Sequence, residues 1–177
     1  MNMHTVRLAA VAMIFFTVDG AGDSARAAPK GGAEGALDPA VFELQVRAEK
    51  GDAAAQFYLG LMYQEGKGVP QDGALAAKWY QRAAEQGDSE AQTNLGTLFH
   101  KGNGVVQDSS KAAKWYRRAA EQGHPVGQAN LARLYATGEG LPQDDVQAHV
   151  WFSLAARQGH AKAAKILELL ANRMTTD

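Results

Sequence analysis

Three tryptophans stand 36 residues apart in this chain, at Trp79, Trp115 and Trp151. Around the first two, the sequence Lys-Trp-Tyr is followed at the same distance by Ala-Ala-Glu-Gln-Gly, and a looser version surrounds the third. Residues 51–86 and 87–122 are identical at 21 of 36 positions. A fixed period of this length is typical of a repeat array, in which one unit cannot bury its apolar face without its neighbours.

Each repeat is predicted to form two helices joined by a glycine turn. In the first unit, apolar residues recur at helical spacing up to Tyr63, and Gly66-Lys67-Gly68-Val69 then breaks the pattern. The first of these glycines suits a left-handed helix end, and Asp72 suits the N-cap of a second helix. Gly60 recurs as Gly96 inside the first helix, which predicts a close helix crossing. The predicted fold class is therefore all-α, with helix pairs that stack on their neighbours.

The array is expected to occupy residues 38–173. It opens with a half-unit at 38–51, in which Asp38 and Pro39 have the residue types of a helix start. The remaining boundaries are whole units at 52–87, 88–123 and 124–159, a half-unit at 160–173, and a tail at 174–177.

The first 27 residues are predicted to form a signal peptide. Arg7 is followed by an apolar run over residues 8–18, and Ala25-Arg26-Ala27 places small residues before a cleavage site after Ala27. The run is too short to cross about 30 Å of hydrocarbon, so no stable membrane span is expected once the signal is removed. Residues 28–37 are rich in glycine and alanine and are expected to form a flexible leader. The expected location is periplasmic or secreted.

Composition argues against several classes of function. The formal net charge is −1, which does not favour a nucleic-acid surface, and the chain has no cysteine for a disulfide, a thiolate metal site or a Cys nucleophile. No zinc-protease histidine pair and no Gly-x-Ser-x-Gly motif occurs. His124 and His160 replace the aspartates that start the earlier first helices, so we expect them to cap helices. No cofactor, metal site or catalytic residue is predicted.

The repeat resembles the Sel-one-like repeat family, a relative of the tetratricopeptide repeat. The resemblance rests on Ala-x-x-x-Leu-Gly-x-x-Tyr at residues 55–63, Gly-x-Gly-Val at 66–69, and Ala-Lys-Trp-Tyr at 77–80 with Ala-Ala-Glu-Gln-Gly at 83–87. It implies a solenoid of stacked antiparallel helix pairs in a right-handed superhelix, and a non-enzymatic adaptor or scaffold that binds another protein in its groove. A plain tetratricopeptide repeat has a period of about 34 residues and lacks the Gly-x-Gly turn. A cysteine-rich subgroup is linked to β-lactam binding, and this chain lacks its cysteines.

In a solenoid of this kind, the first helices line the concave surface, so function is expected where they differ between units. The variable positions are apolar at both ends of the array and polar or basic in the middle. The predicted partner groove consists of Phe57, Tyr58, Leu61, Asn94, Thr97, Lys101, Asn130, Arg133, Ile166 and Leu169. The two asparagines equally suit a role in holding their own helix pairs. For Ile166 and Leu169 the alternative is packing against the helix of Trp151 or a dimer contact.

The predicted function is a protein-binding adaptor or regulator in the bacterial cell envelope. The first alternative is an envelope enzyme or binder that acts on peptidoglycan or β-lactam-like ligands, for which the tryptophans would offer stacking surfaces. Their equivalence between units favours core packing instead. The second alternative is a secreted factor that acts on a host cell.

Overall fold

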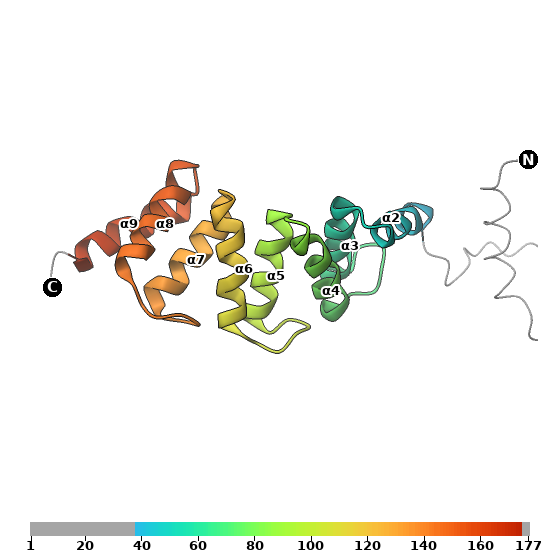
Figure 1. Cartoon of the computed structure of the whole chain (residues 1–177), viewed down its shortest axis with the longest axis horizontal. Coiled ribbons are helices and arrows are strands. Elements are labelled where there is room, and N and C mark those ends of the chain that lie inside the picture. The colour runs from blue at the N-terminus through green and yellow to red at the C-terminus, as the bar shows by residue number, and fades with distance from the viewer. Residues whose placement is uncertain (1–37, 175–177) are drawn as a thin grey trace, which may run out of the picture. The chain divides into compact units, whose positions relative to one another are not determined.

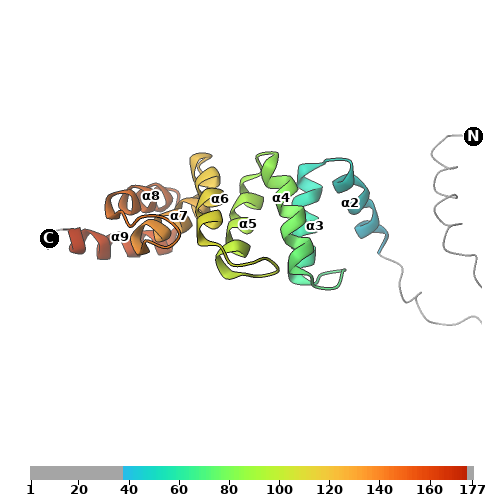
Figure 2. The same ribbon diagram turned by 60° about the horizontal axis from the view of Figure 1, so that its bottom comes forward.

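The computed structural model describes residues 38–174, with side chains described up to residue 167. In this part the chain forms eight helices and no strand, and the helices follow one another in chain order as antiparallel neighbours (Figures 1 and 2). They are α2 (Pro39–Glu49), α3 (Ala53–Glu65), α4 (Gly73–Glu85), α5 (Ser89–Lys101), α6 (Ser109–Glu121), α7 (Pro125–Thr137), α8 (Asp145–Arg157) and α9 (Ala161–Met174). The predicted all-α repeat solenoid is confirmed.

The predicted signal peptide, the leader and residues 175–177 of the predicted tail lie outside the described residues. Met174, the first residue of that tail, is instead the last residue of α9. Among the helices of the described part, none combines the length and apolar character needed to cross a bilayer.

The helix ends use the residues that the sequence predicted. The Asp38 carboxylate accepts a hydrogen bond from the N–H of Ala40 at 2.7 Å, and Asp72 accepts from two N–H groups at the start of α4. Gly66 ends α3 in the left-handed region at φ 69°. Because the same caps recur in the later units, each helix pair starts and stops at the same place in its repeat.

In each of the first two units, a tyrosine of the second helix lies across a glycine of the first helix. A Cβ atom added to Gly60 would lie 2.7 Å from Cδ1 of Tyr80, and Gly96 meets Tyr116 in the same way. Both tyrosines are fully or almost fully buried. The predicted close crossing is therefore present, and the side chain that demands it is an aromatic ring.

Three buried glutamines join successive helices across the array. In each unit, the side-chain amide of a glutamine in the first helix donates to a main-chain carbonyl near the end of the second helix of the preceding unit. The side-chain oxygen of the same glutamine accepts from a second glutamine, which caps the C-terminus of the second helix in its own unit. The first of these, Gln56, donates to the Ala48 carbonyl at 2.9 Å and accepts from Gln86 at 2.7 Å. We call Gln56, Gln92 and Gln128 the glutamine ladder; all three are 3–4% exposed. Each bond to a carbonyl connects one unit to the next.

The second glycine of the glycine turn connects units in another way. Gly104, at φ 73°, lies so close to the backbone of Gly73 that a Cβ atom at this position would overlap it, and Gly140 meets Ser109 in the same manner. In the first unit the equivalent Gly68 faces only side-chain atoms, the nearest being Met62 Cε. The turn of each later unit thus packs directly on the start of the preceding second helix.

Among helices two apart in the described part, α5 and α7 make the most extensive contact, and no pair of second helices matches it. We call the side formed by α3, α5, α7 and α9, which the sequence analysis predicted to be concave, the inner side.

Candidate functional site

Two hollows of similar size open on the first helices, one repeat apart. The N-terminal hollow, of about 180 Å³, is lined by Phe57, Glu90, Thr93, Asn94, His124 and Val126. The C-terminal hollow, of about 190 Å³, is lined by Ala129, Asn130, Arg133, Phe152, His160, Lys162, Ala163 and Ile166. Asn94 and His124 of the first correspond, 36 residues later, to Asn130 and His160 of the second. The two hollows therefore form at equivalent places in successive repeats, although several of the residues that line them differ.

The histidines of both hollows cap helices, as predicted. His124 Nδ1 accepts from the N–H of Gly127 at 3.2 Å, and His160 Nδ1 accepts from the N–H of Ala163 at the same distance. The Thr93 hydroxyl also lies 3.0 Å from His124 Nδ1. Burial lowers the pKa of His124 below its usual range, although Glu90 and Asp88 oppose this shift. The neutral ring, with a lone pair on Nδ1, is the form that makes the cap.

Aromatic side chains of the second helices extend toward the first helices of the inner side. The Tyr116 hydroxyl lies 3.1 Å from the Thr97 hydroxyl of α5. In the preceding unit Leu61 replaces the threonine, and the Tyr80 hydroxyl is buried with no hydrogen-bond partner in the described structure. Burial raises the pKa of Tyr80 to about 12, and nearby Asn94 offsets part of this rise. In the third unit the equivalent aromatic residue is Phe152, which has no hydroxyl group.

Arg133 belongs to a polar cluster beside the C-terminal hollow. Its Nη1 atom lies 3.5 Å from His100 Nε2, which is 3.0 Å from a carboxylate oxygen of Glu139. Ser109 donates to the same oxygen at 3.0 Å. The hydrogen bond with His100, followed by the smaller effects of Ser109 and Arg133, keeps the pKa of Glu139 below its usual value. The cluster fixes the glycine turn against α5 and holds Arg133 at the edge of the hollow.

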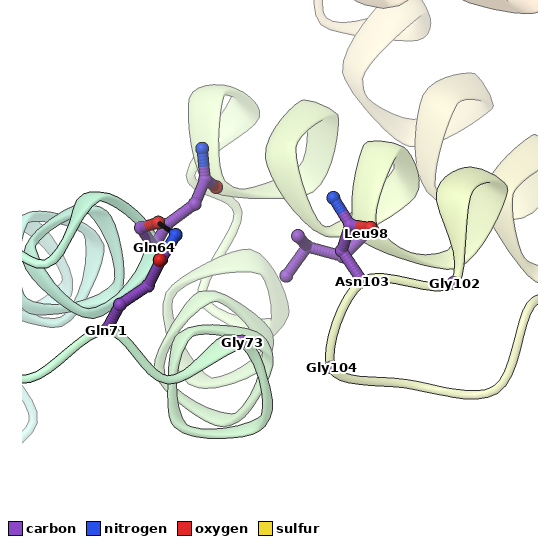
Figure 3. Close-up of a pocket in the computed structure, with 7 residues that line it drawn as sticks. All are labelled: Gln64, Gln71, Gly73, Leu98, Gly102, Asn103 and Gly104. Atoms are coloured by element: carbon purple, nitrogen blue, oxygen red, sulfur yellow. Dashed lines mark hydrogen bonds between the residues drawn. The ribbon is translucent and has the colours of Figure 1, made fainter.

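A third and larger hollow, of about 520 Å³, lies between two glycine turns. Figure 3 shows Gln64 and Gln71 on one side of it and Leu98 and Asn103 on the other. The Gln71 side chain donates to the Gln64 carbonyl at 2.9 Å, so this amide is used within the unit. No charged side chain lines this hollow, and much of its wall is glycine backbone. It is explained by the packing of successive turns.

The ten predicted groove residues divide into three groups. Phe57 and Asn94 line the N-terminal hollow, and Asn130, Arg133 and Ile166 line the C-terminal one. Tyr58, Leu61, Thr97 and Lys101 lie on α3 and α5 outside the hollows; Tyr58 is 55% exposed, with its ring edge on Phe57. The Leu169 side chain lies outside the described residues. The groove as a binding surface stays a prediction.

Sequence reasoning overlooked the variable position near the start of each first helix. This position is Glu90 in α5, Val126 in α7 and Lys162 in α9, and all three side chains line a hollow. These residues visibly differ between units. The variable positions considered in the sequence analysis began three residues further along each first helix, so this position was not among them. Phe152 was also missed, because its equivalence to two buried tyrosines suggested only a core role.

The tryptophans lie in the packing between helices. Trp79 is 7% exposed, and the other two are half-buried against core clusters. Arg82 stacks 4.6 Å from the ring centre of Trp79, and Arg118 stacks at 4.7 Å on Trp115. Within the part that the structure describes, no group of three or more His, Asp or Glu side chains is arranged to hold a metal ion.

Comparison with known proteins finds helical repeat proteins. The Sel1 repeat model matches residues 53–88, 89–124 and 125–160. The chain is similar to a protective antigen of uropathogenic Escherichia coli with an SLR fold (TM-score 0.75, 42% identity), covering 78% of this chain but 30% of the antigen's length. It is also similar to a Sel1 repeat protein from Oxalobacter formigenes (TM-score 0.67, 40% identity), with 73% of this chain and 97% of that protein covered.

A more distant structure shares the fold alone. Helicobacter pylori cysteine-rich protein B has a TM-score of 0.61 and 21% identity, with 75% of this chain and 98% of that protein covered. No protein of curated function matches the chain.

Proposed function

Since the chain belongs to the Sel1 repeat family, we propose that it is a non-enzymatic adaptor whose first helices hold an extended segment of a partner protein. Members of this family are generally protein-interaction modules. The proposal adds the binding surface, the inner side formed by α3, α5, α7 and α9, and the form of the bound segment.

The repeated hollow is the observation that carries this proposal. Each hollow, at about 180–190 Å³, is smaller than the roughly 300–1,000 Å³ of a drug-sized ligand site, and suits a single side chain. Two such recesses at equivalent positions suit a chain that inserts one side chain into each. An extended segment has this regular spacing, and half-exposed Tyr58 with Phe57 offers it an aromatic contact beside the first hollow.

We further propose that the protein acts after export, in the periplasm or outside the cell. The support is the apolar run at residues 8–18 with small residues before Ala28. The Escherichia coli relative is a protective antigen, which is compatible with an exported protein. A fusion of residues 1–37 to a reporter active only outside the cytoplasm tests this; inactivity of the reporter would refute export.

The binding surface is tested by affinity capture from the native envelope fraction after light crosslinking. Tyr58→Glu combined with Arg133→Glu introduces charge on the inner side at positions that are not fully buried. We expect a protein captured by the parent to be lost with this double variant, because its aromatic and cationic contacts are removed.

The matched control is Lys78→Glu, an exposed position on α4 away from the inner side. This control should capture the same protein as the parent, and all variants should keep the parent's helical circular dichroism. Equal capture by the double variant would exclude the inner side as the binding surface. Capture of peptidoglycan alone would favour the envelope-ligand alternative.

A further inference from the structure

The two hollows share their asparagine and histidine but differ in charge. The N-terminal hollow contains one carboxylate, Glu90, and no lysine or arginine, and its His124 is held neutral by the cap that it makes. The C-terminal hollow contains two cations, Arg133 and Lys162, and no carboxylate. The shared residues belong to the repeat, so the residues that differ, these charges among them, distinguish one hollow from the other.

These charges are available to a ligand to different degrees. Lys162 is exposed and forms no ion pair with any side chain that the structure describes, and Glu90 is likewise exposed and without an ion pair in that part. Arg133 is partly satisfied by the charge of Glu139. Glu90 and Lys162 are therefore the main charged groups open to a bound segment.

The walls of both hollows also contain apolar atoms. Phe57 and Val126 line the first, and Phe152 and Ile166 line the second. A long charged side chain suits such a site, because its aliphatic stem packs on apolar atoms while its charged end reaches the rim.

The repeat sets the distance between the two charges. Glu90 lies on α5 and Lys162 on α9, at equivalent positions two repeats apart. Packed helices lie about 8–10 Å apart, so two steps between first helices span about 16–20 Å. An extended chain advances about 3.3 Å per residue, so about five to six residues bridge this distance.

We infer that the inner side selects a segment with a basic side chain for the N-terminal hollow and an acidic side chain about five to six residues away for the C-terminal hollow. This inference rests on the proposed function and adds the chemistry of the partner. The charges are given relative to the hollows, so either the basic or the acidic residue comes first, according to the direction in which the segment lies.

The probe is a library of random peptides displayed on phage, selected on the full exported chain. We expect the enriched peptides to carry opposite charges about five to six residues apart. Selection on Glu90→Lys should replace the basic residue by an acidic one, giving two acidic residues. Selection on Lys162→Glu combined with Arg133→Gln should give two basic residues.

Affinities of single enriched peptides then quantify the effect. One exposed ion pair contributes at most about 1 kcal/mol, which is about fivefold in Kd. Because each charge reversal also places like charges together, a parent-selected peptide should bind either charge variant about five- to tenfold more weakly. Lys78→Glu serves as the control for net charge, since it lies on α4 outside the hollows, and it should leave the affinity and the selected motif unchanged.

The outcomes separate the two proposals. Peptides that bind the inner side, as shown by loss with Tyr58→Glu, but carry the same residues for parent and variants would overturn the charge selection and keep the groove. Failure of every selection, or enrichment of peptides insensitive to Tyr58→Glu, would count against the groove itself.

Discussion

Replacing Gly104 by alanine tests how the units are joined. Gly104 lies in the left-handed region, and a Cβ atom there would overlap the backbone of Gly73 at the start of α4. Gly68 occupies the equivalent position of the first unit with the same φ of 73°, but its added Cβ would meet only Met62 Cε at 3.1 Å and Val41 Cγ2 at 3.3 Å. The chain thus provides a matched control that differs only in the neighbour.

The two substitutions share one energetic cost and differ in a second. Left-handed alanine costs about 1–2 kcal/mol relative to glycine, and both variants lose this amount. Gly68→Ala needs only small shifts of flexible side chains, whereas Gly104→Ala forces two backbone segments apart. Overpacking of this kind costs about 1–3 kcal/mol more. We therefore expect Gly104→Ala to lower the free energy of unfolding by about 2–5 kcal/mol and Gly68→Ala by about 1–2 kcal/mol.

Urea unfolding followed by far-ultraviolet circular dichroism measures both values, and hydrogen exchange shows where stability is lost. In Gly104→Ala, exchange should accelerate at the start of α4 and in the turn before α6, because the contact between units is there. Equal losses for the two variants would show that only the backbone conformation matters and that the contact with Gly73 contributes nothing.

Three further predictions concern buried polar groups. Tyr80→Phe removes a buried hydroxyl without a partner, so thermal unfolding should show stability unchanged or raised by up to about 1 kcal/mol, whereas Tyr116→Phe should lose about 1 kcal/mol. Because the pKa of His124 is lowered in the folded state, its contribution to the free energy of unfolding is complete above about pH 6.5 and is lost as the pH falls below that value. His124→Asp should weaken this pH dependence in a series of unfolding curves. Gln92→Ala should cost about 1–3 kcal/mol in urea unfolding, against nearly nothing for exposed Gln81→Ala. A Gln92→Ala protein as stable as the parent would refute the importance of the ladder.

The sequence predicted the features that depend on neighbouring residues. The aspartate caps and the left-handed end at Gly66 follow from residue types within one or two helical turns, and the close approach at Gly60 follows from its recurrence as Gly96 in the next unit. The 36-residue period then placed these helices in an array. Each of these predictions is confirmed by the cap bonds and by the ring of Tyr80 over Gly60.

The sequence did not separate contacts within a unit from contacts between units. Gln56 and Gln86 are both repeated in the next unit, but their identity does not show that they bond to each other 30 residues apart. Gly104 repeats Gly68, yet only Gly104 has a preceding unit to touch. The charge difference between the hollows was missed for a related reason. Glu90 and Lys162 each line a different hollow, and the walls of each hollow come from three separate helices.

The glutamine ladder has a consequence for how such arrays change in length. Each first-helix glutamine bonds to a main-chain carbonyl of the preceding helix, such as that of Ala48, and that group is the same whatever side chain the residue carries. Gain or loss of one whole unit by gene duplication or deletion therefore restores the same junction. The glycine turns fit this rule as well, since Gly104 and Gly140 both meet backbone. Evolution can thus lengthen or shorten the inner side by one recess at a time, while the residues at its edge diverge to suit different partners.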